Sequence, residues 1–320
     1  MRNAVALLAL ATGCAGALAQ GYPSKPIHLV VGFAPGGAAD IIARTMSDPL
    51  ARVLGQGIIV ENKPGAGSSV AAELVAKASP DGYTIMIASQ SGMIVNPLIN
   101  KNVGYSTARD FAPITQVTSS PLVVAVNPSL KVASIAELIA EAKKAPGKLN
   151  YATSGNGSLP HLAATLFSAI AGVQMVHVPY KSGGQSVQSV LAGDTQVTFA
   201  TAPSVMPLVQ SGRLRGIAVT TRARSPLVAG LPGMEEAGLA GYSLSIWYGF
   251  FAPAGTSREV ITRLFKGTIQ ALGDANLKQV LARDGTETLG SSSPEAFATF
   301  LRNESEVTAR VIRDSGAKFE

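Results

Sequence analysis

Short apolar runs alternate along the chain with longer segments in which apolar residues recur at helical spacing. Most of the runs are apolar at every position, which is typical of parallel strands covered on both faces. They predict strands at residues 27–33, 58–60, 85–88, 122–126, 151–152, 175–178, 197–200 and 217–219. The other segments predict helices at about 38–54, 68–78, 134–145, 159–171, 182–192, 204–211, 257–272 and 293–316. This alternation indicates an α/β fold.

Two prolines bear on the predicted helices. Pro294 follows Ser293, a good N-cap residue, so this pair predicts where the final helix begins. Pro49 falls inside the first predicted helix, where it lacks a backbone N–H and its ring clashes with the preceding turn. We therefore expect a kink or a break at Pro49.

The sequence contains no internal repeat and no low-complexity linker that would mark a domain boundary. Two strand-like segments, 113–126 and 242–251, are candidates for crossings between two domains. If both cross, domain I comprises residues 20–121 plus 249–320, and domain II comprises residues 122–248. Ligands of open α/β sheets bind beyond the carboxyl ends of the strands, so a ligand is expected in the cleft between the domains.

The first residues have the pattern of an export signal. Arg2 precedes a short apolar stretch at 4–11, and an A-x-A sequence ends at Ala19. We expect residues 1–19 to be a signal peptide, cleaved before Gln20, and the mature protein to be periplasmic. The alternative is a lipid anchor on Cys14, the only cysteine. After ordinary cleavage no cysteine remains for a disulfide, a thiol nucleophile or a thiolate metal site.

Charge adds little to this interpretation. The formal net charge is +6, but charged residues make up only 14% of the chain. The lysines and arginines are scattered, without a basic run or interleaved aromatic residues, so nucleic acid is not an expected partner. A mildly basic surface weakly favours anionic ligands by electrostatic steering. No later apolar run is long enough for a transmembrane helix, so we expect a soluble exported protein.

The loop Phe33-Ala34-Pro35-Gly36-Gly37-Ala38-Ala39-Asp40 joins the first predicted strand to the first predicted helix. Adjacent glycines let the backbone approach a ligand closely, and the start of the helix presents free N–H groups and a positive dipole end. The loop therefore predicts an anion site for a carboxylate or a phosphate. Asp40 in the first helical turn either complements the dipole or contacts the ligand.

Four more loops at the ends of predicted strands are rich in small polar residues. They are Ser89-Gln90-Ser91-Gly92, Thr153-Ser154-Gly155-Asn156-Gly157-Ser158, Tyr180-Lys181-Ser182-Gly183-Gly184 and Thr201-Ala202-Pro203-Ser204. Any one of them can be a plain tight turn, but together they point to a polar cleft. His161 follows the second of these loops, and it either faces the cleft or packs at the start of its helix.

Common enzyme signatures are missing. The chain has no G-x-S-x-G, H-E-x-x-H or Walker-type G-K-[ST] motif, and His28, His161 and His177 lack ligand-like spacing. We therefore predict no cofactor, no metal site and no enzymatic activity. A Ser/His/Asp set can still be assembled from Ser154, His161 and Asp194, so a serine hydrolase that uses Ser154 or Ser158 remains an alternative.

Several motifs, spread over essentially the whole mature chain, resemble the Bug family of substrate-binding proteins of tripartite tricarboxylate transporters. They are Tyr22-Pro23-Ser24-Lys25-Pro26-Ile27, the 33–40 loop, Val60-Glu61-Asn62-Lys63-Pro64-Gly65-Ala66-Gly67, Pro80-Asp81-Gly82-Tyr83-Thr84, residues 151–161, Val178-Pro179-Tyr180-Lys181 and Gly249-Phe250-Phe251-Ala252-Pro253-Ala254-Gly255. The resemblance implies a type II-like periplasmic binding protein in which two α/β domains close on a ligand.

The resemblance also implies a ligand site. It places the ligand carboxylate at Gly36, Gly37, Ala38 and Asp40, beside Ser89 and Ser91. From the second domain it implies Ser154, Gly155, Asn156 and Ser158, with Thr201 and Ala202 nearby. The expected site further includes Phe33, His161 and Tyr180.

The resemblance leaves the ligand and part of the physiology open. A dicarboxylate, an amino acid and an aromatic carboxylate present the same group to the glycine loop. The implied partners are the small carboxylate and, transiently, the integral-membrane subunits of a transporter, with the binding protein itself a monomer. An exported sensor that presents its closed form to a receptor is the alternative.

Overall fold

A computed structural model describes residues 21–315 of the chain. The predicted signal peptide, its cleavage site and Cys14 lie outside the described residues. Within the described part, no helix has the length and apolar character needed to cross a membrane.

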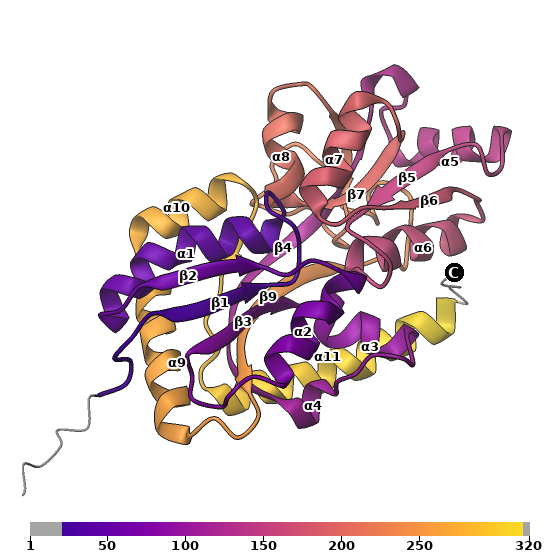
Figure 1. The fold of residues 1–320 in the computed structure, drawn as a ribbon. Helices are drawn as coiled ribbons and strands as arrows, with labels where there is room; N and C mark the ends of the chain where they lie inside the picture. The colour runs from indigo at the N-terminus through magenta and orange to yellow at the C-terminus, as the bar shows by residue number, and fades with distance from the viewer. Residues whose placement is uncertain (1–20, 316–320) are drawn as a thin grey trace, which may run out of the picture.

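A long strand, β4 (Phe111–Val126), joins the two halves of a mixed sheet (Figure 1). In the first half, β1 (Ile27–Val31) lies between β2 (Ile58–Asn62) and β3 (Thr84–Ser89), and all three are parallel. The sheet continues from β3 through the antiparallel strand β9 (Ser245–Pro253) to the first part of β4, which also pairs with β10 (Glu287–Thr288).

The second half of the sheet begins where β4 changes its neighbours, between Pro121 and Leu122. From Leu122 onward β4 pairs antiparallel with β7 (Val197–Thr201) and, on its other side, β8 (Arg215–Val219). β5 (Asn150–Thr153) follows β7, and β6 (Val176–Pro179) forms the edge, with all three parallel. Segment 220–244 leads from β8 back to β9 in the first half.

Helices cover both faces of each half. In the first half, α1 (Ala38–Leu54), α9 (Arg258–Leu272) and α10 (Ala275–Arg283) lie on one face, and α2 (Ser69–Ala76) and α11 (Pro294–Ser315) on the other (Figure 1). The short helices α3 (Asn96–Ile99) and α4 (Thr107–Asp110) flank α2. In the second half, α5 (Ile135–Lys144) and α6 (Leu159–Ala171) cover one face, and α7 (Gly183–Ala192) and α8 (Ala202–Gln210) the other.

The predicted α/β fold is confirmed, and the segment 113–126 does run from one half of the sheet into the other. The position of the domain boundaries remains a prediction. Residues 245–248, which the sequence assigns to domain II, pair within the first half of the sheet.

Of the kink or break expected at Pro49, the break is wrong, because α1 continues through it to Leu54 and ends at Gly55 with φ 80°. Pro49 is buried, and the neighbouring Leu50 and Leu54 pack in the main core. Burial of that apolar turn outweighs the single hydrogen bond that proline removes. The predicted start of the final helix is confirmed, since Ser293 Oγ accepts the Ala296 N–H at 3.1 Å.

Candidate ligand-binding cleft

The start of α1 forms one wall of a cleft between the two halves. Gly36 has φ +81°, which favours glycine, and Gly37 is the N-cap residue of α1. No side chain caps this helix start. The first-turn N–H groups and the positive end of the helix dipole are therefore available to an anion.

Asp40 braces the glycine loop from behind. Its Oδ2 accepts the Gly36 N–H at 3.0 Å, and its Oδ1 accepts Arg44 Nε and Asn62 Nδ2, each at 2.9 Å. Asn62 Nδ2 also donates to the Phe33 carbonyl at 3.0 Å. The Asp40 carboxylate, 4% exposed, is thus occupied by protein donors. It fixes the loop rather than facing the cleft.

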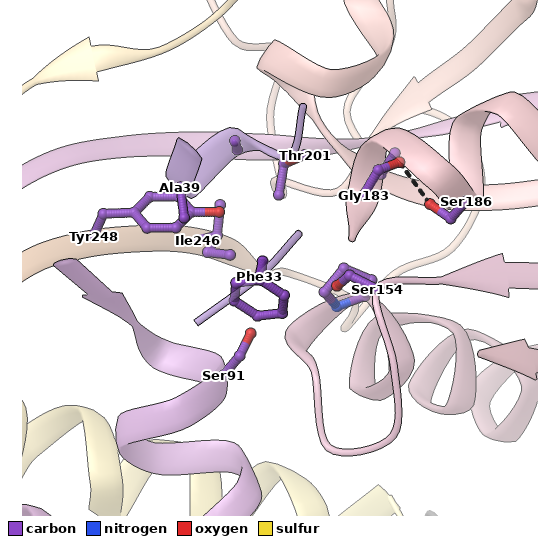
Figure 2. A pocket seen from close by; sticks show the side chains of 13 residues that line it. Phe33, Ala39, Ser91, Ser154, Gly183, Ser186, Thr201, Ile246 and Tyr248 are labelled. Carbon is purple, nitrogen blue, oxygen red and sulfur yellow. Dashed lines mark hydrogen bonds between the residues drawn. The ribbon is translucent and has the colours of Figure 1, made fainter. Parts of the chain in front are cut away.

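The main hollow of the cleft is lined by residues from both halves, and no charged side chain is among them (Figure 2). The lining residues are Phe33, Gly37, Ala38, Ala39, Ser91, Ser154, Pro160, Gly183, Ser186, Ala200, Thr201, Ile246 and Tyr248. The enclosed space measures about 20 Å³, which is room for about one water molecule.

The polar groups of this hollow are neutral hydrogen-bonding groups. Ser91, Ser154 and Thr201 supply hydroxyls, and α8 begins beside Thr201 with no side-chain cap, as α1 does. Burial raises the pKa of the Tyr248 phenol well above its usual range, so its hydroxyl stays protonated. Two uncapped helix starts and several hydroxyls suit the binding of an anion by hydrogen bonds.

The two halves touch around the hollow. The Ala34 N–H donates to the Lys181 carbonyl at 3.1 Å, and the Leu159 N–H donates to Ser91 Oγ at 2.9 Å. A Cβ on Gly184 would lie 2.6 Å from the Gly36 carbonyl oxygen, so this contact requires glycine. The structure is therefore a closed form in which backbone meets backbone across the cleft.

A second hollow adjoins the first and shares Phe33 and Ser154 with it. It is also lined by Gly65-Ala66-Gly67-Ser68, Gly155, Asn156, Pro179, Tyr180 and Lys181, and it measures about 230 Å³. Lys181 is the one residue with a charged side chain among the described residues that line the two hollows. No ion pair of Lys181 occurs within residues 21–315.

Comparison with known proteins decides the family. The model of the tripartite tricarboxylate transporter family receptor matches residues 42–317. The chain belongs to this receptor family. The predicted resemblance to the Bug family is confirmed by BugT of Bordetella pertussis, which is 32% identical over 303 residues, covering 94% of this chain and 93% of BugT.

Two solved structures of similar proteins contain a carboxylate. R. palustris Rpa4515 with adipate is 33% identical, with a TM-score of 0.88 over 92% of this chain and 98% of that one. MatC from Rhodopseudomonas palustris with bound malate is 26% identical, with a TM-score of 0.87 over 91% of this chain and 100% of that one.

The structure brings many of the residues expected from the sequence to the two hollows. Phe33, Gly37, Ala38, Ser91, Ser154 and Thr201 line the main hollow, and Gly155, Asn156 and Tyr180 line the second one. Six expected residues line neither hollow: Gly36, Asp40, Ser89, Ser158, His161 and Ala202. Contact of any of these residues with a ligand remains a prediction.

The expected residues outside both hollows cap a helix, line outer grooves or are buried. Ser158 caps α6, because its Oγ accepts the His161 N–H at 3.3 Å. His161 lines an outer groove with Asn96 and Asn156. Gly36 lines another groove beside α7, and Ser89 and Ala202 are buried.

Two residues that line the main hollow, Ile246 and Tyr248, were not expected from the sequence. Ile246 and Tyr248 lie near the start of β9 and face the main hollow, whereas Trp247 between them packs on Phe297 in the core behind the sheet. Strand alternation predicts that neighbours face opposite sides. β9 is apolar on both faces, however, so its sequence does not indicate which side faces the cleft.

Proposed function

We propose that this protein is a periplasmic solute-binding protein that captures a small organic carboxylate between its two halves. The observation that carries the proposal is the uncapped start of α1, which borders a hollow with no charged side chain. Helix N–H groups and the helix dipole stabilise an anion without a partner charge. The hydroxyls of Ser91, Ser154 and Thr201 can complete the hydrogen bonding. The adipate and malate in the structures of two relatives support a carboxylate as the ligand.

Binding is coupled to closure in this proposal. The main hollow has room for about one water molecule, so a carboxylate ligand requires the halves to move apart on entry. The Ala34–Lys181 and Ser91–Leu159 hydrogen bonds then re-form when the halves close around the ligand. Such closure removes water from the ligand's hydrogen bonds and strengthens them.

We further infer that the remainder of the ligand extends past Phe33 into the second hollow. That hollow has about 230 Å³ of space and contains Lys181, whose ammonium favours a second negative group. Among the ligand classes left open by the sequence, a dicarboxylate therefore fits best. The glycine loop binds the group that all candidates share, and the second hollow selects among them.

We propose that the protein binds its ligand without catalysing a reaction. The Ser154, His161 and Asp194 set that a hydrolase would need is dispersed, since Asp194 is exposed and lines a groove beside α7 while His161 lines a groove beside α3. Ser158 Oγ serves as a helix cap. The described residues also hold no cluster of three or more His, Cys, Asp or Glu side chains suited to a metal ion.

Delivery to a transporter completes the proposal. The chain belongs to the family of tripartite tricarboxylate transporter receptors, so the partner proposed here is the membrane part of such a transporter. The export-type sequence at residues 1–19 supports a periplasmic location, where the closed form would meet that partner.

The test is ligand capture by the purified protein. Adipate, malate, an amino acid and benzoate are each added, and the melting temperature and the recovered compounds are measured. We expect at least one carboxylate to raise the melting temperature and to be recovered unchanged, because a ligand that binds only the native state stabilises it. Conversion to a product, or no stabilisation together with no carboxylate released on denaturation, would contradict the proposal.

A further inference from the structure

Three aromatic rings stack beside the cleft segment 154–157 (residues Ser154, Gly155, Asn156 and Gly157). The His177 ring on β6 lies 4.0 Å from the His161 ring on α6, with 12° between the ring planes. It also lies 5.0 Å from the Tyr151 ring on β5, at 18°. Tyr151 and His177 are paired in the parallel register of β5 and β6, so both side chains project from the same face of the sheet. Figure 1 shows these strands beside α6.

Both imidazoles are tied to the cleft segment by hydrogen bonds. His177 Nε2 lies 2.6 Å from Thr153 Oγ1, and the same hydroxyl oxygen accepts the Gly155 N–H at 3.2 Å. His161 Nδ1 accepts the Gly157 N–H at 3.4 Å. The stacked pair thus reaches both glycines of the segment, one through the buried Thr153 and the other directly.

These hydrogen bonds matter because the two glycines give the backbone of the segment high conformational freedom. Gly155 has φ +118° and Gly157 has φ +73°, conformations in which glycine is favoured. Glycine backbone also loses more conformational entropy than other residues when it is fixed. A segment ordered before the ligand arrives binds it at a lower entropic cost. The segment supplies Ser154 to the main hollow, and Gly155 and Asn156 to the second one.

We propose that His161 and His177 are positioning residues that hold segment 154–157 in its ligand-binding conformation. The functional part of this inference rests on the proposed carboxylate-binding function. The pair acts in its neutral form, because His161 Nδ1 must keep its lone pair to accept the Gly157 N–H. Stacking keeps each ring in the plane that aims its nitrogen at the segment.

The first test uses amide hydrogen exchange of the ligand-free protein over residues 154–158. His177→Phe retains a ring for stacking but removes the bond to Thr153, and Thr153→Val removes the hydroxyl at similar size. We expect each variant to speed exchange in the segment about tenfold, which corresponds to the loss of one hydrogen bond. The double variant should be no faster than Thr153→Val alone, because Thr153→Val already removes the hydroxyl that His177 contacts. Exchange as slow as in the wild type, or additive effects, would overturn the proposal.

Two further variants separate positioning from simple packing. His28→Phe makes the same replacement on β1, where His28 Nδ1 is paired with Glu61 Oε1, and it should leave exchange in the segment unchanged. His177→Gln places an amide near the position of Nε2 and should restore slow exchange, although it cannot stack as an imidazole does. The proposal fails if two results occur together. Amide exchange in the segment is as fast in His177→Gln as in His177→Phe, and His177→Phe melts at a lower temperature than the wild type. His177 would then act only by packing.

The second test measures the dissociation constants of adipate and malate. We expect His177→Phe and Thr153→Val to weaken whichever probe the wild type binds by about three- to tenfold, with His28→Phe unchanged. Equal affinity in all four proteins would overturn the positioning role in binding. If the wild type binds neither probe nor any other carboxylate, the proposed function fails, whereas the exchange experiment still decides whether the histidines position the segment.

Discussion

The Gly36 N–H donates a hydrogen bond to Asp40 Oδ2 at 3.0 Å, so the acidic residue nearest the predicted anion site holds the glycine loop. Three protein donors share this buried carboxylate. Asp40 therefore supports the loop that carries the free N–H groups, and its negative charge is shared among protein donors.

Replacement of Asp40 tests this arrangement. Asp40→Asn removes the charge that Arg44 pairs with and leaves a buried donor unsatisfied, so we expect a loss of about 1–3 kcal/mol in the free energy of unfolding. Carboxylate affinity should fall as the loop loosens. Asp48→Asn on the exposed side of the same helix is the control. Urea unfolding and calorimetry measure the two effects, and a gain in affinity would mean that Asp40 faces and repels the ligand.

Closure depends on the lack of a side chain at Gly184. A Cβ there would lie 2.6 Å from the Gly36 carbonyl oxygen, far inside van der Waals contact. Alanine also favours a helix relative to glycine, so Gly184→Ala should unfold at the same or a higher temperature yet bind carboxylate at least about tenfold more weakly. Small-angle scattering should detect no ligand-induced compaction. The control is Gln188→Ala, one turn later on α7, and normal compaction in Gly184→Ala would exclude this contact as part of closure.

Lys181 should distinguish dicarboxylates from monocarboxylates. We expect Lys181→Met to weaken adipate binding about five- to tenfold by removing the cation of the second hollow. Hexanoate, which has one carboxylate on a chain of the same length, should bind equally to the variant and the wild type. Lys148→Met, an exposed lysine before β5, serves as the control. An equal loss for both ligands, or none, would place the second carboxylate elsewhere.

The stacked histidines give the protein a predictable sensitivity to acid. Burial lowers the pKa of His161 to about 4 and that of His177 to about 3, and the neighbouring His161 contributes to the lowering at His177. In the unfolded chain both pKa values are about 6.5. Since the folded values are the lower ones, the stability that the neutral pair contributes is complete above about pH 6.5 and is lost as the pH falls through the folded values.

We therefore expect the free energy of unfolding to fall by about 2–4 kcal/mol between about pH 7 and about pH 5 because of this pair, since each imidazole that stays neutral contributes up to about 2 kcal/mol. A His161→Phe/His177→Phe variant should lose less over the same range. The Tyr151 ring stacks on His177, and Lys101 lines the same groove as His161. Urea unfolding at several pH values makes the comparison, and identical pH slopes in the two proteins would contradict it.

Much of the site could be predicted from local sequence because local chemistry determines it. Two adjacent glycines between an apolar strand and a helical segment sufficed to locate the start of α1, and the small polar residues after β5 and β7 located Ser154 and Thr201. In each case a strand end and a helix start lie within a few residues, so no tertiary information is needed.

The rest of the site depends on tertiary structure. Ile246 and Tyr248 face the cleft because β9 pairs in one particular register with β3 and β4, which the sequence of a doubly buried strand does not reveal. Gly183 and Ser186 reach the hollow through contact between the two halves. The helix continues through Pro49 for a similar reason, since core packing there outweighs the local rule that predicts a break.

A crystal structure of the complex with the carboxylate that stabilises the protein most tests the central claim directly. The account predicts one ligand carboxylate within hydrogen-bond distance of the first-turn N–H groups of α1, at Ala38 and Ala39, with the two halves closed over it. A ligand whose carboxylates lie elsewhere, or one held mainly by charged side chains, would contradict the account.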